Sequence, residues 1–132
     1  MIERFTKRSR FTSQQDFIDN FSIDIPDRFN FAYDVVDAWA AEQPDKRALL
    51  WTDDKGHERS YTFAEIKDLT DRTASFFSSL GIGRGDMVML ILRRRVEFWL
   101  SIIALHKIGA VAIPATHLLT AGDIVYRCNA AP

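Results

Sequence analysis

The sequence has very little of several features that define specialised classes of protein. Its 132 residues contain one cysteine, Cys128, which excludes an internal disulfide and a cysteine-rich zinc site. We expect this cysteine to be a small core residue. Seventeen basic residues nearly balance eighteen acidic ones, and the net charge of −1 argues against a general nucleic-acid-binding protein. No apolar run reaches the roughly 20 residues of a membrane-spanning helix. The beginning also lacks the apolar segment of a secretory signal, so we expect a cytoplasmic protein.

The first 29 residues differ in composition from the rest and form the first of two expected regions. They contain no leucine or valine, and basic residues gather at their beginning. Isolated aromatic rings on a polar segment predict an arm that docks its rings on a larger body, while a disordered tail is the plainer alternative. A transit peptide is a third interpretation, weakened by Glu3, Asp16 and Asp19. Six of the ten phenylalanines belong to this segment or follow it directly: Phe5, Phe11, Phe17, Phe21, Phe29 and Phe31.

Residues 30–132 form the second region and begin with a helix, a hairpin and another helix. Asn30 can cap a helix that Pro44 ends. Residues 47–52 and 58–62 read as two strands around the turn signal at 53–56. Thr62 and Glu65 form a capping box for the next helix. We expect one buried stripe on that helix and a helix end at Gly81; the expected stripe is Ile66, Leu69, Thr73, Phe77 and Leu80.

The last third of the chain predicts a parallel βαβ unit. Residues 87–92 are a continuous apolar run, typical of a strand covered on both faces. Residues 96–108 are apolar nearly all round, which predicts a buried helix, and 110–114 form a second strand. A final helix begins near Thr120. The fold class is therefore α/β, a β-hairpin and a parallel βαβ with flanking helices. It is incomplete, because such a layout would continue with another strand at an open sheet edge.

Three consecutive arginines and two residues after the second strand are the candidate site. Arg93, Arg94 and Arg95 follow a predicted parallel strand, at the edge where open α/β sheets bind ligands. They are candidates for binding an anionic cofactor, and a solvated loop is the alternative. Thr116 and His117 follow the next strand and are candidate substrate-binding residues. The glycines at 81–85 follow a helix and open a strand, the reverse of a phosphate-binding loop, so we interpret them as a helix end. No residue pattern predicts a metal site or a nucleophile beside a base.

Several stretches in register resemble the beginning of the adenylate-forming superfamily, which includes acyl-CoA synthetases, aryl-CoA ligases and luciferases. The matching stretches are AAEQPDKRAL at 40–49, YTFAE at 61–65, LGIGRGDMV at 80–88 and KIGAVAIP at 107–114. Two more, at 29–35 and 120–127, are similar to medium-chain acyl-CoA synthetases and their acetyl-CoA synthetase relatives. This resemblance implies that residues 30–132 are part of the large AMP-binding domain of an AMP-forming acid–CoA ligase.

The resemblance implies a two-step reaction in the whole ligase. A carboxylate attacks Mg-ATP to give an acyl-adenylate and pyrophosphate, and CoA then displaces AMP. The implied substrates and cofactors are therefore a carboxylic acid, ATP, Mg²⁺ and CoA. None of the family's catalytic motifs occurs in these residues, so no catalytic residue is assigned and we expect the chain alone to be inactive. In the family, Thr116 and His117 would lie near the acyl and pantetheine channel. The alternatives are an aryl-CoA ligase, a carrier-loading adenylation domain, or a non-catalytic binding or assembly module of the same fold. We expect the isolated chain to self-associate through its open sheet edge or through the phenylalanine-rich arm.

Overall fold

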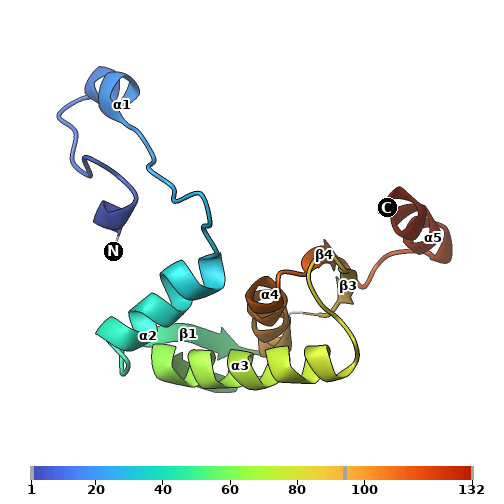
Figure 1. Cartoon of the computed structure of the whole chain (residues 1–132). Helices are drawn as coiled ribbons and strands as arrows, with labels where there is room; N and C mark the ends of the chain where they lie inside the picture. Colours follow the sequence, from blue (N-terminus) through green and yellow to red (C-terminus); the bar gives the residue numbers. More distant parts are fainter. Residues whose placement is uncertain (1, 94, 132) are drawn as a thin grey trace.

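The computed structural model describes residues 2–93 and 95–131. Figure 1 shows an N-terminal arm, a central body of helices around a hairpin, and a final helix set apart from that body. The mixed α/β class is confirmed, with one antiparallel and one parallel pair of strands. In chain order the elements are η1 (Ile2–Arg4), α1 (Gln14–Asn20), η2 (Ala32–Asp37), α2 (Ala38–Glu42), β1 (Arg47–Thr52), β2 (Glu58–Thr62), α3 (Phe63–Ser79), β3 (Met87–Ile91), α4 (Val96–Ile108), β4 (Val111–Ala115) and α5 (Ala121–Ala130).

The hairpin of β1 and β2 has the bounds that the sequence predicts, and an aspartate organises its turn. Asp53 Oδ1 accepts the backbone N–H groups of Lys55 and His57, both at 2.9 Å. Gly56 takes a φ of +81°, which glycine adopts without the clash of a Cβ. The turn is therefore fixed by local side-chain and backbone chemistry, and the register of the two strands follows from it.

Helix α3 begins and ends as its sequence signals predict. Thr62 Oγ1 accepts the N–H of Glu65 at 3.2 Å, and Glu65 Oε2 accepts the N–H of Thr62 at 2.8 Å. At the other end Gly81 has a φ of +84°, and the N–H of Ile82 donates to the carbonyl of Phe77 at 3.1 Å. This closure is a Schellman motif, so the glycine-rich segment ends a helix and leads into β3.

The buried stripe of α3 differs from the predicted one. The buried residues are Ile66, Thr70 and Ala74, whereas Leu80 is 62% exposed. Small side chains in the middle of the helix allow α4, which packs against α3, to approach closely. The prediction followed the large apolar side chains, whereas the contact face is centred on small ones.

Strands β3 and β4 are parallel, as predicted. Strand β3 begins at Met87 as predicted and ends one residue earlier, at Ile91, whereas β4 begins and ends one residue later than predicted, at Val111 and Ala115. Met87 pairs with Val111 and Ile91 with Ala115. The expectation that the first strand is covered on both faces is wrong, because Met87 and Ile91 are exposed. Among the described residues this sheet has two strands, which leaves part of its surface open.

Helix α4 connects these strands and contributes to both core clusters. Ile103, Ala104 and Leu105 are buried, and Gly109 ends the helix with a φ of +73°. The prediction that the whole helix is buried is wrong for its first turns, because Trp99 is 51% exposed. One core cluster joins η2, β2, α3 and α4: Ala32, Val36, Tyr61, Ile66 and Ile103. A second joins β3, α4 and the residue that precedes β4: Leu90, Leu105 and Ala110.

The first helix after the arm begins beside Asn30, but its first part is a π-helix. Asn30 Oδ1 accepts the N–H of Ala32 at 2.9 Å, so the predicted capping residue does bind the helix start. The helix then continues as α2 and ends at Glu42, just before Pro44.

The N-terminal arm folds mainly on itself. The rings of Phe17 and Phe21 stack at 4.6 Å, and Phe11 contacts Phe17 edge-on at 5.1 Å. An isolated bridge pairs Thr6 with Ile23. Figure 1 shows this segment extending away from the body, so docking of its rings into pockets of a larger body stays a prediction.

The C-terminal helix α5 has a complete capping box but little packing. Thr120 Oγ1 accepts the N–H of Asp123, and Asp123 Oδ2 accepts the N–H of Thr120 at 2.9 Å. None of its described side chains is buried, and the expected core position of Cys128 is wrong because that residue is exposed. No helix in the described part of the chain combines the length and the apolar character needed to cross a membrane.

Candidate functional site

The carboxyl ends of β3 and β4 lie at the same edge of the parallel sheet. Because Ile91 pairs with Ala115, the segments that follow the two strands leave the sheet side by side. Arg93 and Arg95 belong to the first segment, and Thr116 and His117 to the second. This edge is where open parallel sheets commonly bind ligands. Arg94 lies outside the described residues.

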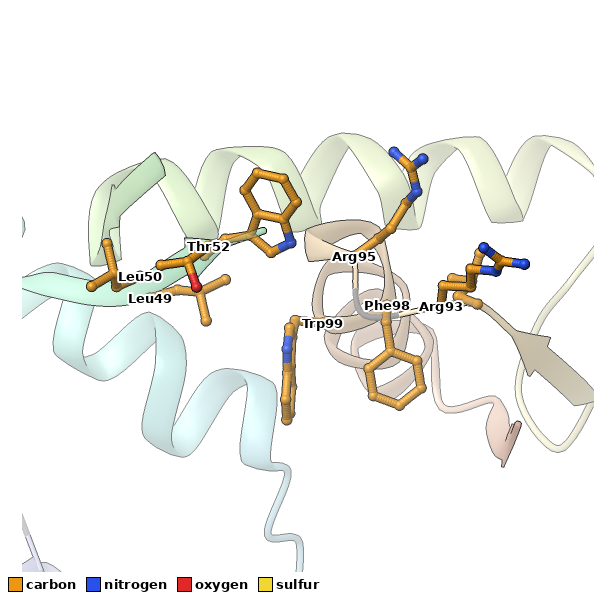
Figure 2. A pocket seen from close by; sticks show the side chains of 9 residues that line it. Leu49, Leu50, Thr52, Arg93, Arg95, Phe98 and Trp99 are labelled. Carbon is orange, nitrogen blue, oxygen red and sulfur yellow. The ribbon is translucent and has the colours of Figure 1, made fainter. Parts of the chain in front are cut away.

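Arg93 and Arg95 line an open cleft at the start of α4. The N–H of Arg95 donates to the carbonyl of Arg93 at 2.6 Å. Both side chains are exposed. Figure 2 shows Arg95 projecting on one side of the start of α4, and Phe98 and Trp99 on the other. The cleft has a volume of about 420 Å³ and is lined by Leu49, Leu50, Trp51, Thr52, Leu92, Arg93, Arg95, Phe98 and Trp99.

Thr116 and His117 are exposed and do not line this cleft. Thr116 Oγ1 accepts the N–H of Leu118 at 3.3 Å, which forms a short turn between β4 and α5. The fold therefore brings the arginines and these two residues to one edge without joining them in one cleft.

A buried lysine near the end of α4 joins three helices. Lys107 Nζ donates to Asp37 Oδ1 at 2.8 Å and Oδ2 at 3.0 Å, and to Asp71 Oδ1 at 2.5 Å. Its side chain is only 2% exposed, against 15% for Asp37 and 44% for Asp71. The hydroxyl of Tyr33 also donates to the carbonyl of Lys107 at 3.2 Å. Since Asp37 closes η2, Asp71 belongs to α3 and Lys107 to α4, these bonds hold the three helices together.

The ionisation of Asp71 depends on this network. Burial raises its pKa, but hydrogen bonds from Lys107 and Lys67 and the charges of both lysines more than offset that effect. The net result is a pKa below the usual value, so Asp71 is a carboxylate at neutral pH. In return, the hydrogen bond to Asp71 raises the pKa of Lys67.

Sequence reasoning missed this network, although one signal was visible. A lysine within the otherwise apolar run of 96–108 needs an acidic partner if the helix is buried. The sequence does not say which acid provides it, because Asp37 and Asp71 lie 70 and 36 residues away. The aromatic residues of the cleft were missed for the same reason, since Trp51 comes from β1 and Phe98 and Trp99 from α4.

The described residues contain no group of three or more His, Cys, Asp or Glu side chains that could hold a metal ion. His57 Nδ1 instead lies 2.7 Å from Asp53 Oδ2 in the hairpin turn. The glycine-rich segment, as described above, ends a helix and cannot present helix N–H groups to a phosphate. The described acidic, histidine and cysteine side chains therefore do not fit a magnesium ion, and the glycine-rich segment does not fit the triphosphate of ATP.

A family model described as AMP-binding enzyme matches residues 36–132. The chain belongs to this family of AMP-binding enzymes. Among curated relatives, it is similar to human acyl-coenzyme A synthetase ACSM3, mitochondrial, with 37% identity over 89% of this chain and 21% of the relative. It is also similar to mouse acyl-coenzyme A synthetase ACSM1, mitochondrial, with 41% identity over 79% of this chain and 19% of the relative. The chain thus spans about a fifth of the length of these AMP-binding enzymes.

Solved structures of the same family share the fold. A Mycobacterium tuberculosis fatty acyl CoA synthetase superimposes with a TM-score of 0.69 and 26% identity, covering 77% of this chain and 20% of that one. The N-terminal subdomain of Klebsiella oxytoca NpsA gives a TM-score of 0.67 and 26% identity, covering 74% of this chain and 24% of that one. The predicted resemblance to adenylate-forming enzymes is therefore confirmed.

Proposed function

We propose that this chain is part of an AMP-forming acid–CoA ligase. The whole ligase activates a fatty or other carboxylic acid with ATP, releases pyrophosphate, and transfers the acyl group from the adenylate to CoA. The observation that carries this proposal is the family match over residues 36–132, together with relatives named acyl-coenzyme A synthetases at 37% and 41% identity. Magnesium would accompany ATP in that reaction.

The chain by itself is proposed to be inactive. The family's phosphate-binding loop, its aromatic–Thr–Glu motif and its distal lysine do not occur in the 132 residues. Without a cradle for the phosphates and a cation on the developing charge, the transition state of adenylation has no stabilisation. The chain contributes an architectural part of the large domain in this proposal.

The edge of the parallel sheet is the proposed ligand-facing surface. Arg93, Arg94 and Arg95 would face an anionic group of a cofactor, because cations at a strand's carboxyl end attract negative charge. Thr116 and His117 would form part of a channel wall for the acyl or pantetheine chain. The parallel pairing of β3 and β4 and the exposure of the four described residues support this assignment.

Carboxylate-dependent exchange of pyrophosphate into ATP tests the ligase proposal. The assay compares this chain with a full-length protein that contains it, using a panel of short, medium and aromatic acids. We expect exchange by the long form only, and the acid panel then defines its substrate preference. Absence of exchange by the long form with every acid would overturn the proposal in favour of a non-catalytic module.

An aryl-CoA ligase and a carrier-loading adenylation domain are the enzymatic alternatives. The fold is similar to that of NpsA, and one NpsA structure is described as an artificially fused adenylation–PCP di-domain. This similarity is the reason to test the carrier-loading reaction. Thioester formation separates the two possibilities. A ligase gives acyl-CoA from CoA, whereas a carrier-loading enzyme gives product only with a phosphopantetheinylated carrier protein.

Two further properties are proposed for the chain as it stands. Residues 1–29 form an arm separate from the partial AMP-binding domain at 30–132. The exposed apolar residues of β3 and β4, Met87, Ile91 and Val111, favour self-association of the isolated chain. Sedimentation across a concentration series tests this, and a monomer at every concentration contradicts it.

The proposed location is the cytoplasm, because acidic residues within the arm are unusual for a transit peptide. The relatives named above are mitochondrial proteins. Fractionation of cells that express the tagged protein distinguishes the compartments, and recovery in mitochondria would overturn the cytoplasmic assignment.

A further inference from the structure

An apolar groove lies between the helix formed by η2 and α2 on one side and α4 on the other. Its volume is about 380 Å³, and the buried side chains of Val36, Ile66 and Ile103 contribute to its lining. Apart from His106, every residue that lines it is apolar or aromatic. An open apolar surface of this kind marks a place where another apolar element binds. The partly or fully exposed residues along it include Phe31, Val35, Trp39, Leu49, Phe63 and Trp99.

The tip of the N-terminal arm carries apolar side chains that its own fold does not cover. Helix α1 presents Phe17, Ile18 and Phe21, which are 43%, 61% and 38% exposed. Phe17 and Phe21 stack on each other and Phe11 meets both rings, but this small cluster stays half open. The tip is therefore an apolar surface of the size of one helical turn, matched in character to the groove.

The base of the arm is fastened to its own body. Arg4 forms an ion pair with Glu42 at the end of α2, and the ring of Phe5 meets that of Phe29 edge-on at 5.5 Å. The N–H of Asp24 also donates to the carbonyl of Phe5 at 2.7 Å. Figure 1 shows α1 at the far end of the arm, away from the helices that line the groove. These contacts hold the tip off the groove of its own chain and leave it in reach of another molecule.

Charge and area favour a second copy of this chain as that molecule. Residues 1–29 contain five basic and five acidic residues, so the arm lacks the excess of positive charge that draws a segment to an anionic membrane. Two tips placed in two grooves would bury about 1,100 Å² in total, if a large side chain offers 150–250 Å². This exceeds the roughly 1,000 Å² that a specific interface requires.

We propose that two copies of this chain dimerise by exchanging their arms. Each copy places Phe17, Ile18 and Phe21 in the apolar groove of the other. Because each copy gives one tip and receives one, the two contacts are related by a two-fold axis, and neither tip nor groove is left open. The inference rests on the self-association proposed above and names its surfaces, and it needs no adenylation chemistry.

Sedimentation equilibrium of the 132-residue chain measures the association, from about 1 to about 300 μM, since interfaces near the lower size limit bind weakly. Ile18→Lys alters the tip and Trp99→Lys alters the groove. We expect each to weaken the dimer at least tenfold, because a lysine would enter an apolar contact. Val111→Lys is the matched control: it changes an exposed apolar residue of β4 that does not line the groove, and the dissociation constant should stay within about twofold.

Mixing the tip variant with the groove variant tests the exchange itself. Trp99→Lys keeps an intact tip and Ile18→Lys keeps an intact groove, so one of the two contacts can form between them. We expect the mixture to associate at concentrations where each variant alone is a monomer. Thermal unfolding verifies that these substitutions of exposed side chains leave the fold intact, and Phe31→Lys replaces the groove variant if Trp99→Lys does not fold.

The remaining outcomes overturn the proposal in distinguishable ways. Loss of the dimer in Val111→Lys but not in the other variants assigns the interface to the open sheet edge. Loss in Ile18→Lys alone assigns it to a contact between two arms, which mixing cannot restore. A mixture that stays monomeric, or a wild type that is monomeric at every concentration, also refutes the exchange. None of these results bears on the ligase proposal, which the pyrophosphate exchange of the long form decides.

Discussion

Replacing the buried Lys107 by methionine should destabilise the chain strongly. Methionine keeps much of the apolar stem of lysine but removes the three hydrogen bonds to Asp37 and Asp71. Asp37 is then left with a largely buried carboxylate, since its side chain is only 15% exposed. Asp71 suffers less, because it is 44% exposed and keeps Lys67 at 2.6 Å. Most of the effect therefore comes from Asp37.

The size of this effect follows from the cost of leaving a buried charge without its partner. Removing one member of a buried ion pair costs about 3–5 kcal/mol. Because Asp37 retains some solvent contact, we expect the lower end of that range for Lys107→Met, about 3 kcal/mol. In urea unfolding with a slope of about 2 kcal/mol/M, that loss moves the midpoint by about 1.5 M.

Two further variants make the measurement decisive. Lys67→Met removes an exposed lysine from the same Asp71, and we expect a loss of no more than about 0.5 kcal/mol. Adding Asp37→Leu to Lys107→Met removes the unpaired carboxylate, which should recover most of the lost stability. The reasoning is refuted if Lys107→Met costs less than about 1 kcal/mol, or if the second substitution recovers nothing.

Three other expectations concern stability and use the same urea assay. Thr62→Ala removes the capping hydroxyl of α3 and should cost about 1 kcal/mol; a loss of helix signal without any loss of stability would contradict it. Gly109→Ala should lower the free energy of unfolding more than Gly81→Ala does. Both glycines have a positive φ, but a Cβ at position 109 would lie 3.2 Å from Arg84 Cγ, whereas a Cβ at position 81 would meet nothing within 4 Å. The lowered pKa of Asp71 stabilises the folded chain fully when the pH is above the unfolded pKa of about 3.8, and this stability is lost as the pH falls through the folded pKa. The wild type should therefore lose more stability than Asp71→Asn between pH 5 and pH 2. Parallel curves of stability against pH for the two proteins would refute this.

The elements that the sequence predicts well are those determined by neighbouring residues. The hairpin strands, the capping box at Thr62 and the bounds of α4 depend on period, turn chemistry and caps within a few positions. The candidate edge was also predictable, since two apolar strands separated by a single helix are usually parallel neighbours. The sequence therefore predicts that Arg93 and His117 lie at one edge of the sheet.

Features that depend on distant packing could not be predicted in the same way. The buried face of α3 is centred on Thr70 and Ala74, because α4 packs there, and nothing within the helix itself selects those small residues. The partners of Lys107 come from two other helices. Exposure of Trp99 and Cys128 was missed because an apolar pattern predicts burial without specifying what covers the residue.

Stability and ligand binding in this chain should reside in separate sets of side chains. The hydrogen bonds of Lys107 hold three helices together inside the chain. Arg93 and Arg95 instead lie at an open edge and form no ion pair with an acidic side chain in residues 2–93 or 95–131. Loss of an exposed arginine changes a ligand's affinity but removes no internal bond, and loss of the buried lysine does the reverse. If Lys107→Met, at a temperature where it is folded, weakened the binding of an anionic ligand as much as replacing Arg93 and Arg95 by glutamine does, this separation would be wrong. The cleft would then depend on the placement of α4 by its buried lysine.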